Sequence, residues 1–167
     1  MLLVSPTLSQ IQRAKKEARE MGVLKNSATN GGGNVCGMLG EILFHSHYGG
    51  KRVPKSCRTH DVTLKNGVRV DVKSQLTQNV ISRDFVIRIY APWESRKWLT
   101  TKCDVYYFIK IQRGTYFSSF VGWTYSCNLL DDFEFTPVGG INPFDGRRAS
   151  ADEFSAESSA LKSADLF

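Results

Sequence analysis

Apolar and polar residues alternate twice in the segment 59–75, which predicts two half-buried strands joined by a short turn. The apolar positions are Val62 and Leu64 in the first run and Val68, Val70 and Val72 in the second. A two-residue turn at Asn66-Gly67 would pair Val62 with Asp71 and so mix apolar and charged residues on one face. A three-residue loop, 65–67, with Gly67 left-handed avoids this conflict. It pairs Leu64 with Val68, Val62 with Val70 and Asp61 with Asp71.

Upstream of this hairpin the pattern predicts two helices. One opens at Asn34, after three glycines, and stops at Gly49-Gly50. The other is amphipathic, begins at Ser5-Pro6-Thr7, runs through Met21 and closes at Gly22.

Downstream we expect further strands in the segments 84–90, 104–111 and 115–125. The second of these is apolar almost throughout, as in a central strand, and the third would be its antiparallel neighbour. Residues 91–102 form either a short helix or a loop on the core.

The chain of 167 residues suits one domain, 1–150, followed by an acidic, Ser- and Ala-rich tail, 151–167. Phe154, Leu161 and Phe167 could tether a terminal helix in that tail.

The expected register places two carboxylates opposite each other, because Asp61 faces Asp71 across the hairpin. Like charges in such a position destabilise a sheet unless a positive group lies between them. Lys73 shares a face with Asp71, and a divalent cation would supply further charge. Oxygen ligands of this kind suit Mg²⁺ or Mn²⁺. The alternative is an ordinary exposed strand face that binds no metal.

Glu41 is the candidate third acid. It lies in the apolar helix that opens at Asn34, where a glutamate is unusual without a partner. Gly37 and Gly40 would let another backbone come close to the side that bears it. The alternative is an acid that reaches solvent or forms an ion pair.

These residues together resemble the PD-(D/E)XK nuclease superfamily. The match consists of Gly-x-x-Gly-Glu on a helix, then an aspartate at a strand, then a hairpin into Asp71-Val72-Lys73. Two positions depart from the usual pattern. His60 stands where a proline usually precedes the first aspartate, and Asp71 stands where a glutamate is common. Neither departure removes a metal-binding oxygen.

The resemblance implies an α/β fold of the restriction-endonuclease-like type, a mixed β-sheet flanked by helices with an αβββαβ core. It implies a Mg²⁺-dependent DNA endonuclease, with Mn²⁺ able to substitute. Asp61, Asp71 and the Val72 carbonyl would hold the metal, and Glu41 would complete or orient its shell. Lys73 would orient the attacking water and help to neutralise the transition state.

The spacing of these residues looks similar to that of phage and archaeal junction-resolving nucleases, which act as dimers on branched DNA. We therefore expect a structure-specific enzyme that forms a homodimer. A restriction-type or repair nuclease, or an exonuclease, would use the same centre, and Gln75 stands where some exonuclease-like relatives carry a glutamine. The alternative from another class is a nucleic-acid-binding module on the same fold that no longer cuts.

Charge agrees with a polyanionic partner. The formal net charge is +6, and because the tail contributes −3, residues 1–150 carry +9. Two basic segments are candidates for contacts with the DNA backbone. The first segment lies before the hairpin and contains Lys51, Arg52, Lys55 and Arg58, and the second lies near two tryptophans and contains Arg96 and Lys97. Gln75, in the second strand of the hairpin, is a further candidate for DNA binding. The alternative in each case is a solvated surface.

The cysteines, at positions 36, 57, 103 and 127, form no Cys-x-x-Cys pair, which favours reduced thiols. Their spacing relative to His45, His47 and His60 argues against a zinc site. The sequence carries no signal-peptide pattern and no apolar run long enough to cross a bilayer. We therefore expect a cytoplasmic protein without a membrane partner, in the host cytoplasm if it is phage-encoded.

Overall fold

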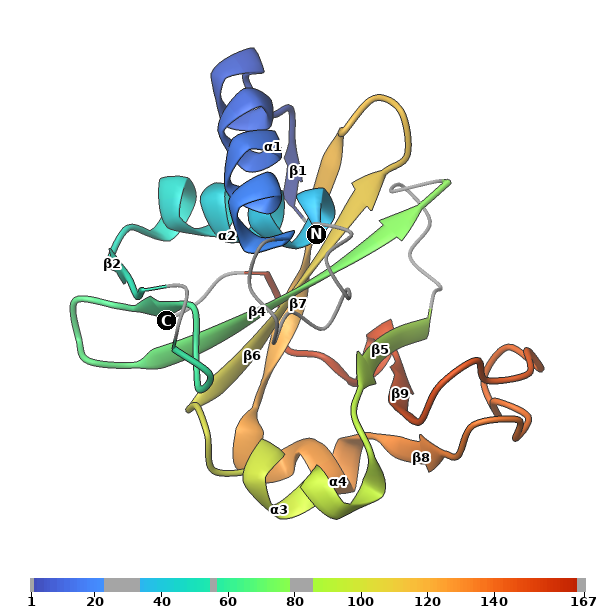
Figure 1. Cartoon of the computed structure of the whole chain (residues 1–167). Coiled ribbons are helices and arrows are strands. Elements are labelled where there is room, and N and C mark those ends of the chain that lie inside the picture. Colours follow the sequence, from blue (N-terminus) through green and yellow to red (C-terminus); the bar gives the residue numbers. More distant parts are fainter. Residues whose placement is uncertain (1, 23–33, 55–56, 79–85, 165–167) are drawn as a thin grey trace.

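The computed structural model describes residues 2–22, 34–54, 57–78 and 86–164, and the arrangement of its elements is shown in Figure 1. The strands are β1 (Leu2–Val4), β2 (Lys51–Arg52), β3 (Val62–Thr63), β4 (Arg69–Thr77), β5 (Val86–Tyr90), β6 (Val105–Gln112), β7 (Ser118–Tyr125), β8 (Glu134–Thr136) and β9 (Glu153–Glu157). The helices are α1 (Leu8–Gly22), α2 (Val35–Tyr48), α3 (Arg96–Leu99) and α4 (Leu129–Asp132), with 3-10 turns η1 (Trp93–Ser95), η2 (Ser126–Asn128) and η3 (Ser158–Ala160).

The described strands form a large mixed sheet and a small antiparallel one. The large sheet has the order β1-β7-β6-β4-β3-β2, and the small sheet has the order β5-β9-β8. Within the large sheet, β4 runs parallel to β6 and β6 runs antiparallel to β7. This confirms the α/β class, the mixed sheet, the central strand near 104–111 and its antiparallel neighbour.

The local signals around α2 and the hairpin gave the predicted structure. The Asn34 side chain caps α2 by accepting a hydrogen bond from the Gly37 N–H at 2.8 Å, and the helix ends at Gly49. In the hairpin, Val62 pairs with Val70, and Gly67 has a φ of 86°. The three-residue loop is therefore confirmed.

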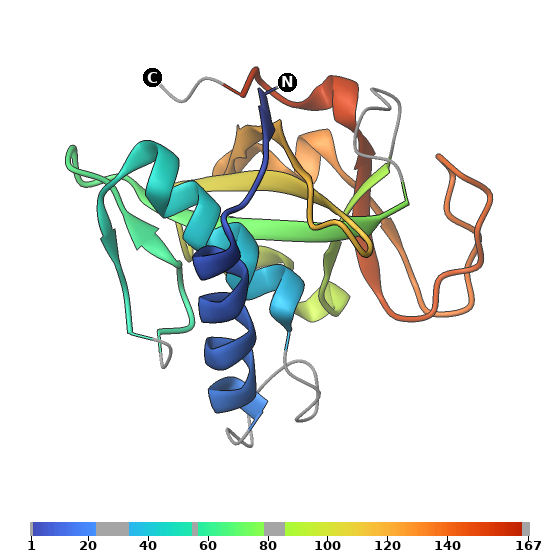
Figure 2. The same ribbon diagram turned by 90° about the horizontal axis from the view of Figure 1, so that it is seen from above.

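Two hydrophobic cores lie on opposite faces of β6, because its side chains alternate. Tyr107 and Ile109 belong to the first core, which α2 closes by packing on β4 and β6 while α1 packs on α2. Figure 2 shows both helices on the same side of the large sheet. Tyr106 and Phe108 belong to the second core, on the other face. No described helix is long and apolar enough to cross a bilayer.

The second face of the large sheet differs from expectation. Instead of a long helix, it is covered by the small sheet and the short α3 and α4, which contribute residues such as Ile87, Phe154 and Leu129 to the second core. Residues 151–164, expected to belong to an acidic tail, are part of this layer. Within it, β9 is the middle strand of the small sheet, and Glu153 and Phe154 are fully buried. Its acidic composition suggested solvent exposure, but Phe154 and Ala156 lie in the second core and Glu153 forms ion pairs with Arg88 and Arg147.

Candidate functional site

The site is organised around the middle of β4, where the hairpin partner ends. Among the described strands, β3 pairs with β4 only at Arg69 and Val70, so the edge of β4 from Val72 onward has no strand beside it on that side. Asp71 and Lys73 point to the face that carries Tyr106 and Phe108 of the adjacent β6. The opposite face of β4 receives α2, with Gly40 against Ser74.

Asp61 lies at the open edge of β4. Its backbone N–H donates to the Val70 carbonyl at 2.9 Å, and its carboxylate accepts from the Val72 N–H at 2.7 Å. The ladder itself stops at Val62, so Asp61 is held beside β4 by one backbone and one side-chain hydrogen bond and is not a regular cross-strand partner of Asp71. Because the N–H and C=O of one residue in a strand point to the same side, the Val72 carbonyl also faces this edge.

Glu41 reaches the site from α2 and is held by an arginine. Arg52 donates to Glu41 at 2.9 Å and to Glu17 of α1 at 2.8 Å, and its side chain is only 15% exposed. Arg52 was expected to contact DNA phosphates, because its segment is basic. In the structure it instead joins α1, α2 and β2 through two acids.

The three acids influence one another electrostatically. Burial raises the pKa of Asp61 well above its usual value, and the negative charges of Asp71 and Glu41 raise it further. Burial likewise raises the pKa of Glu41 despite the opposing effect of Arg52, and Asp71 adds to the increase. Asp71 thus acts electrostatically both on Glu41, which comes from α2, and on Asp61 at the strand edge.

Asp71 is the acid with the strongest positive surroundings. One of its oxygens contacts the Lys73 ammonium at 2.7 Å, and the other contacts the ammonium of Lys102, a residue just after α3. Burial would raise the pKa of Asp71, but the two ammonium groups outweigh it and lower the pKa. For Lys73, burial would lower the pKa, but Asp71 and Asp61 outweigh it and raise the pKa. Lys73 is therefore a cation at neutral pH.

Lys102 was not among the residues predicted for the site. It is 31 positions from Asp71 in the chain, and its side chain is only 6% exposed. Its ammonium also lies 4.8 Å from the ring centre of Trp98 and 5.4 Å from that of Tyr106. The interleaving of basic and aromatic residues in 91–102 was the only sequence signal near it.

The donor atoms are of the kind that hard divalent cations prefer, since they are carboxylate and carbonyl oxygens. Its present arrangement is not a finished metal site. In the described part of the chain, no three His, Cys, Asp or Glu side chains gather closely enough to hold a metal ion. Each carboxylate is instead engaged by a group of the protein itself: Glu41 by Arg52, Asp61 by the Val72 N–H, and Asp71 by Lys73 and Lys102.

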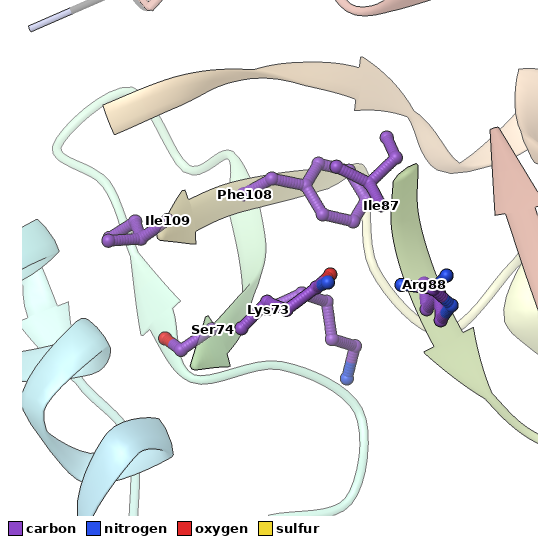
Figure 3. Close-up of a pocket in the computed structure, with 7 residues that line it drawn as sticks. Lys73, Ser74, Ile87, Arg88, Phe108 and Ile109 are labelled. Carbon is purple, nitrogen blue, oxygen red and sulfur yellow. The ribbon is translucent and has the colours of Figure 1, made fainter. Parts of the chain in front are cut away.

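A small pocket opens beside Lys73, between β4, β5 and β6 (Figure 3). Its lining residues are Lys73, Ser74, Gln75, Ile87, Arg88, Phe108 and Ile109. Figure 3 shows Lys73 and Arg88 on facing strands of this pocket. Gln75 therefore lies next to the catalytic candidates rather than on a distant surface.

The remaining DNA-contact candidates lie on the surface or outside the described residues. Lys51, Arg58 and Lys97 are exposed, and Lys55 falls outside the described residues. Arg96 stacks over the Trp93 ring at 4.3 Å.

No known protein-family model matches this chain, and no curated protein sequence matches it.

Proposed function

We propose that this protein is a Mg²⁺-dependent DNA endonuclease that hydrolyses phosphodiester bonds. The observation that carries the proposal is the position of Asp61 at the open edge of β4, where it accepts from the Val72 N–H, next to Asp71 and its ion-paired Lys73. The order of elements supports it, because α2 is followed by the β3–β4 hairpin and by β6 parallel to β4. This order is similar to that of restriction-endonuclease-like folds.

Each residue has a role that its position supports. Asp61, Asp71 and the Val72 carbonyl would hold the metal, and Glu41 would complete the shell directly or through water. The bound metal would activate water and stabilise negative charge on the phosphate. Lys73 would orient the attacking water and help to neutralise the charge that develops on the phosphorus oxygens, and its raised pKa keeps it cationic for that task.

The proposed substrate is branched or junction DNA, cleaved by a homodimer that presents one site to each strand. The net charge of +6 favours a polyanionic partner. Exposed Lys51, Arg58 and Lys97 are available for phosphate contacts, which position DNA without reading its sequence.

A panel of DNA substrates tests this proposal. Linear duplex, flap and four-way junction substrates are incubated with the protein in Mg²⁺, in Mn²⁺ and in excess chelator. We expect cleavage in either metal, none in chelator, and the fastest cleavage on a branched substrate. Asp71→Asn and Lys73→Ala should each lower the cleavage rate by about a hundredfold or more while keeping DNA binding.

Lys65→Ala is the matched control, since Lys65 is exposed in the turn of the same hairpin. It should cleave like the unmodified protein. Binding that is unaffected by chelator, with no cleavage in either metal, would reject the proposal in favour of a binding module. Near-normal nicking by Lys73→Ala would reject the role assigned to that lysine.

A further inference from the structure

Two tryptophans in the segment η1–α3 reach the surface, and their surroundings differ. Trp93 is 42% exposed and Trp98 is 46% exposed, so exposure alone does not distinguish them. Trp93 packs against the small sheet. Its ring is stacked on that of Phe154, with the ring centres 6.0 Å apart, and lies 5.0 Å from that of Phe135. The Arg96 guanidinium lies over the same ring at 4.3 Å, so Trp93 is engaged within the protein.

Trp98 is held in place but leaves much of its ring in solvent. In the described part of the chain, the one aromatic or cationic partner of this ring is the Lys102 ammonium, at 4.8 Å. The Trp98 carbonyl accepts from the N–H groups of Thr101 and Lys102 at 3.1 and 2.9 Å. The carbonyl of the next residue, Leu99, accepts from the buried Tyr106 hydroxyl at 2.8 Å. The backbone under the ring is therefore anchored while the ring itself remains accessible.

The Trp98 ring lies beside the candidate site. The ammonium of Lys102 that contacts the ring also forms an ion pair with Asp71. The other oxygen of Asp71 contacts the Lys73 ammonium at 2.7 Å, and the Lys73 side chain is 31% exposed. Lys97, the residue before Trp98, is exposed and adds positive charge to this surface. An accessible aromatic ring thus stands among cations, next to the lysine to which the proposed function assigns a catalytic role.

We propose that Trp98 is a stacking platform for an unpaired DNA base next to the candidate site. Aromatic rings combined with positive charge hold single-stranded nucleic acid, because every base has a flat π-face and every nucleotide carries a phosphate. A base inside a duplex has both faces covered by its neighbours, so Trp98 takes a base only where the duplex is interrupted, as at a branch or a flap. The inference rests on the proposed function, since it takes DNA as the ligand, and it names a residue that selects branched DNA over linear duplex.

DNA binding in excess chelator tests the inference without any cleavage. Affinity for a single strand and for the matching linear duplex is measured by fluorescence anisotropy. Trp98→Leu should bind the single strand about tenfold more weakly, because it removes the stacking surface, and should bind the duplex with unchanged affinity. Trp98→Phe keeps an aromatic face and should retain most of the single-strand affinity. Trp93→Leu is the matched control, since Trp93 is similarly exposed but packs on Phe135 and Phe154, and it should bind both DNAs like the unmodified protein.

The outcomes separate this inference from the proposed function. Unchanged single-strand affinity of a folded Trp98→Leu variant overturns the inference, as does an equal loss on the duplex or an equal loss in Trp93→Leu. The nuclease proposal then still depends on its own cleavage assay. A selective loss of single-strand binding in a protein that cleaves no DNA supports the inference and rejects the nuclease. Absence of DNA binding by the unmodified protein overturns both.

Tryptophan fluorescence keeps the inference testable if Trp98→Leu does not fold. The chain has three tryptophans, and Trp123 is only 6% exposed, so emission from a Trp93→Phe variant reports mainly on changes at Trp98. We expect this emission to fall when a single strand is added and to stay unchanged with the duplex. Unchanged emission at saturating single strand overturns the inference.

Discussion

The carboxylate of Asp61 accepts a hydrogen bond from the backbone N–H of Val72 at 2.7 Å, at the place where β3 no longer accompanies β4. A side chain thus satisfies a strand N–H that would otherwise need a partner strand. Burial raises the pKa of this carboxylate, and the negative charges of Asp71 and Glu41 raise it further. Asp61 is therefore a buried acid whose ionised form is disfavoured in the folded protein.

Asp61→Asn should therefore stabilise the protein at neutral and alkaline pH while abolishing the proposed DNA cleavage. The asparagine oxygen can still accept from Val72, but the buried negative charge is gone. We expect the free energy of unfolding at pH 8, measured by urea denaturation without metal, to rise by about 1 kcal/mol. A variant less stable than the unmodified protein at pH 8 would contradict this.

The pH dependence of that difference has a definite sign. Since the pKa of Asp61 is higher in the folded than in the unfolded protein, the folded state holds more protons between the two pKa values, and stability falls as pH rises through that window. The gain from Asp61→Asn should therefore shrink towards pH 4. Asp104 is the control, because its hydrogen bond to Arg69 lowers its pKa. Asp104→Asn should leave stability at pH 8 unchanged or slightly reduced.

Local sequence signals were sufficient for the hairpin and for α2. The alternation of apolar and polar residues in the hairpin decided which side chains face the core. Only the three-residue loop kept Val62 and Val70 on one face. Asn34 marked the start of α2 because its side chain caps the first turn, and Gly49 marked the end because it adopts a positive φ of 73°. These signals lie within a few residues of the structure that they specify.

The rest of the site depends on contacts between distant segments, which such signals do not encode. Lys102 reaches Asp71 across 31 positions, and Arg52 reaches Glu17 across 35. The basic character of both residues was visible, but the choice between a phosphate contact and an internal ion pair depends on packing. In the same way, the acidic composition around Glu153 gave no sign of the small sheet that buries it.

Arg52→Met should destabilise the protein by about 3 kcal/mol, because it leaves Glu17 and Glu41 without their shared cation in a largely buried position. Thermal and urea unfolding measure this loss. Arg13→Met is the matched control, since Arg13 pairs with the same Glu17 from a position that is 56% exposed, and it should cost about 0.5 kcal/mol or less. Equal effects of the two changes would show that the Arg52 bridge is not structural.

Acid titration gives a second view of the Arg52 bridge. Burial opposes ionisation of Glu17, but its hydrogen bonds to Arg52 and Arg13 prevail and lower its pKa to about 2. Because the folded pKa is depressed, the stabilising contribution is present above the unfolded pKa and is lost as pH falls towards 2. The Arg52→Met variant should lose less stability than the unmodified protein between pH 5 and about 2.

Gly40→Ala should destabilise the protein although alanine favours helices by about 1 kcal/mol over glycine. A methyl group at Gly40 would overlap the Ser74 hydroxyl and push α2 away from β4. We expect a lower unfolding midpoint, and Gly40→Ala combined with Ser74→Gly should recover most of the loss. Gly37→Ala in the same helix is a comparison of a different kind, because its methyl group would crowd the Asn34 side chain that caps α2 and would not meet β4. A stabilised Gly40→Ala variant would show that α2 does not pack as closely as described.

Truncation after Ser150 should abolish cooperative folding of the protein. The removed segment contains β9, the strand between β5 and β8, and Phe154, which is fully buried with its ring 5.1 Å from that of Phe135. Phe154→Ala should by itself cost about 3–5 kcal/mol, because it opens a cavity in the second core. Leu130→Ala is the control, since Leu130 is 41% exposed and its loss should cost well under half as much. A truncated protein that unfolds at the same temperature as the full chain would mean that the small sheet is dispensable, and the acidic segment would then be an appendage after all.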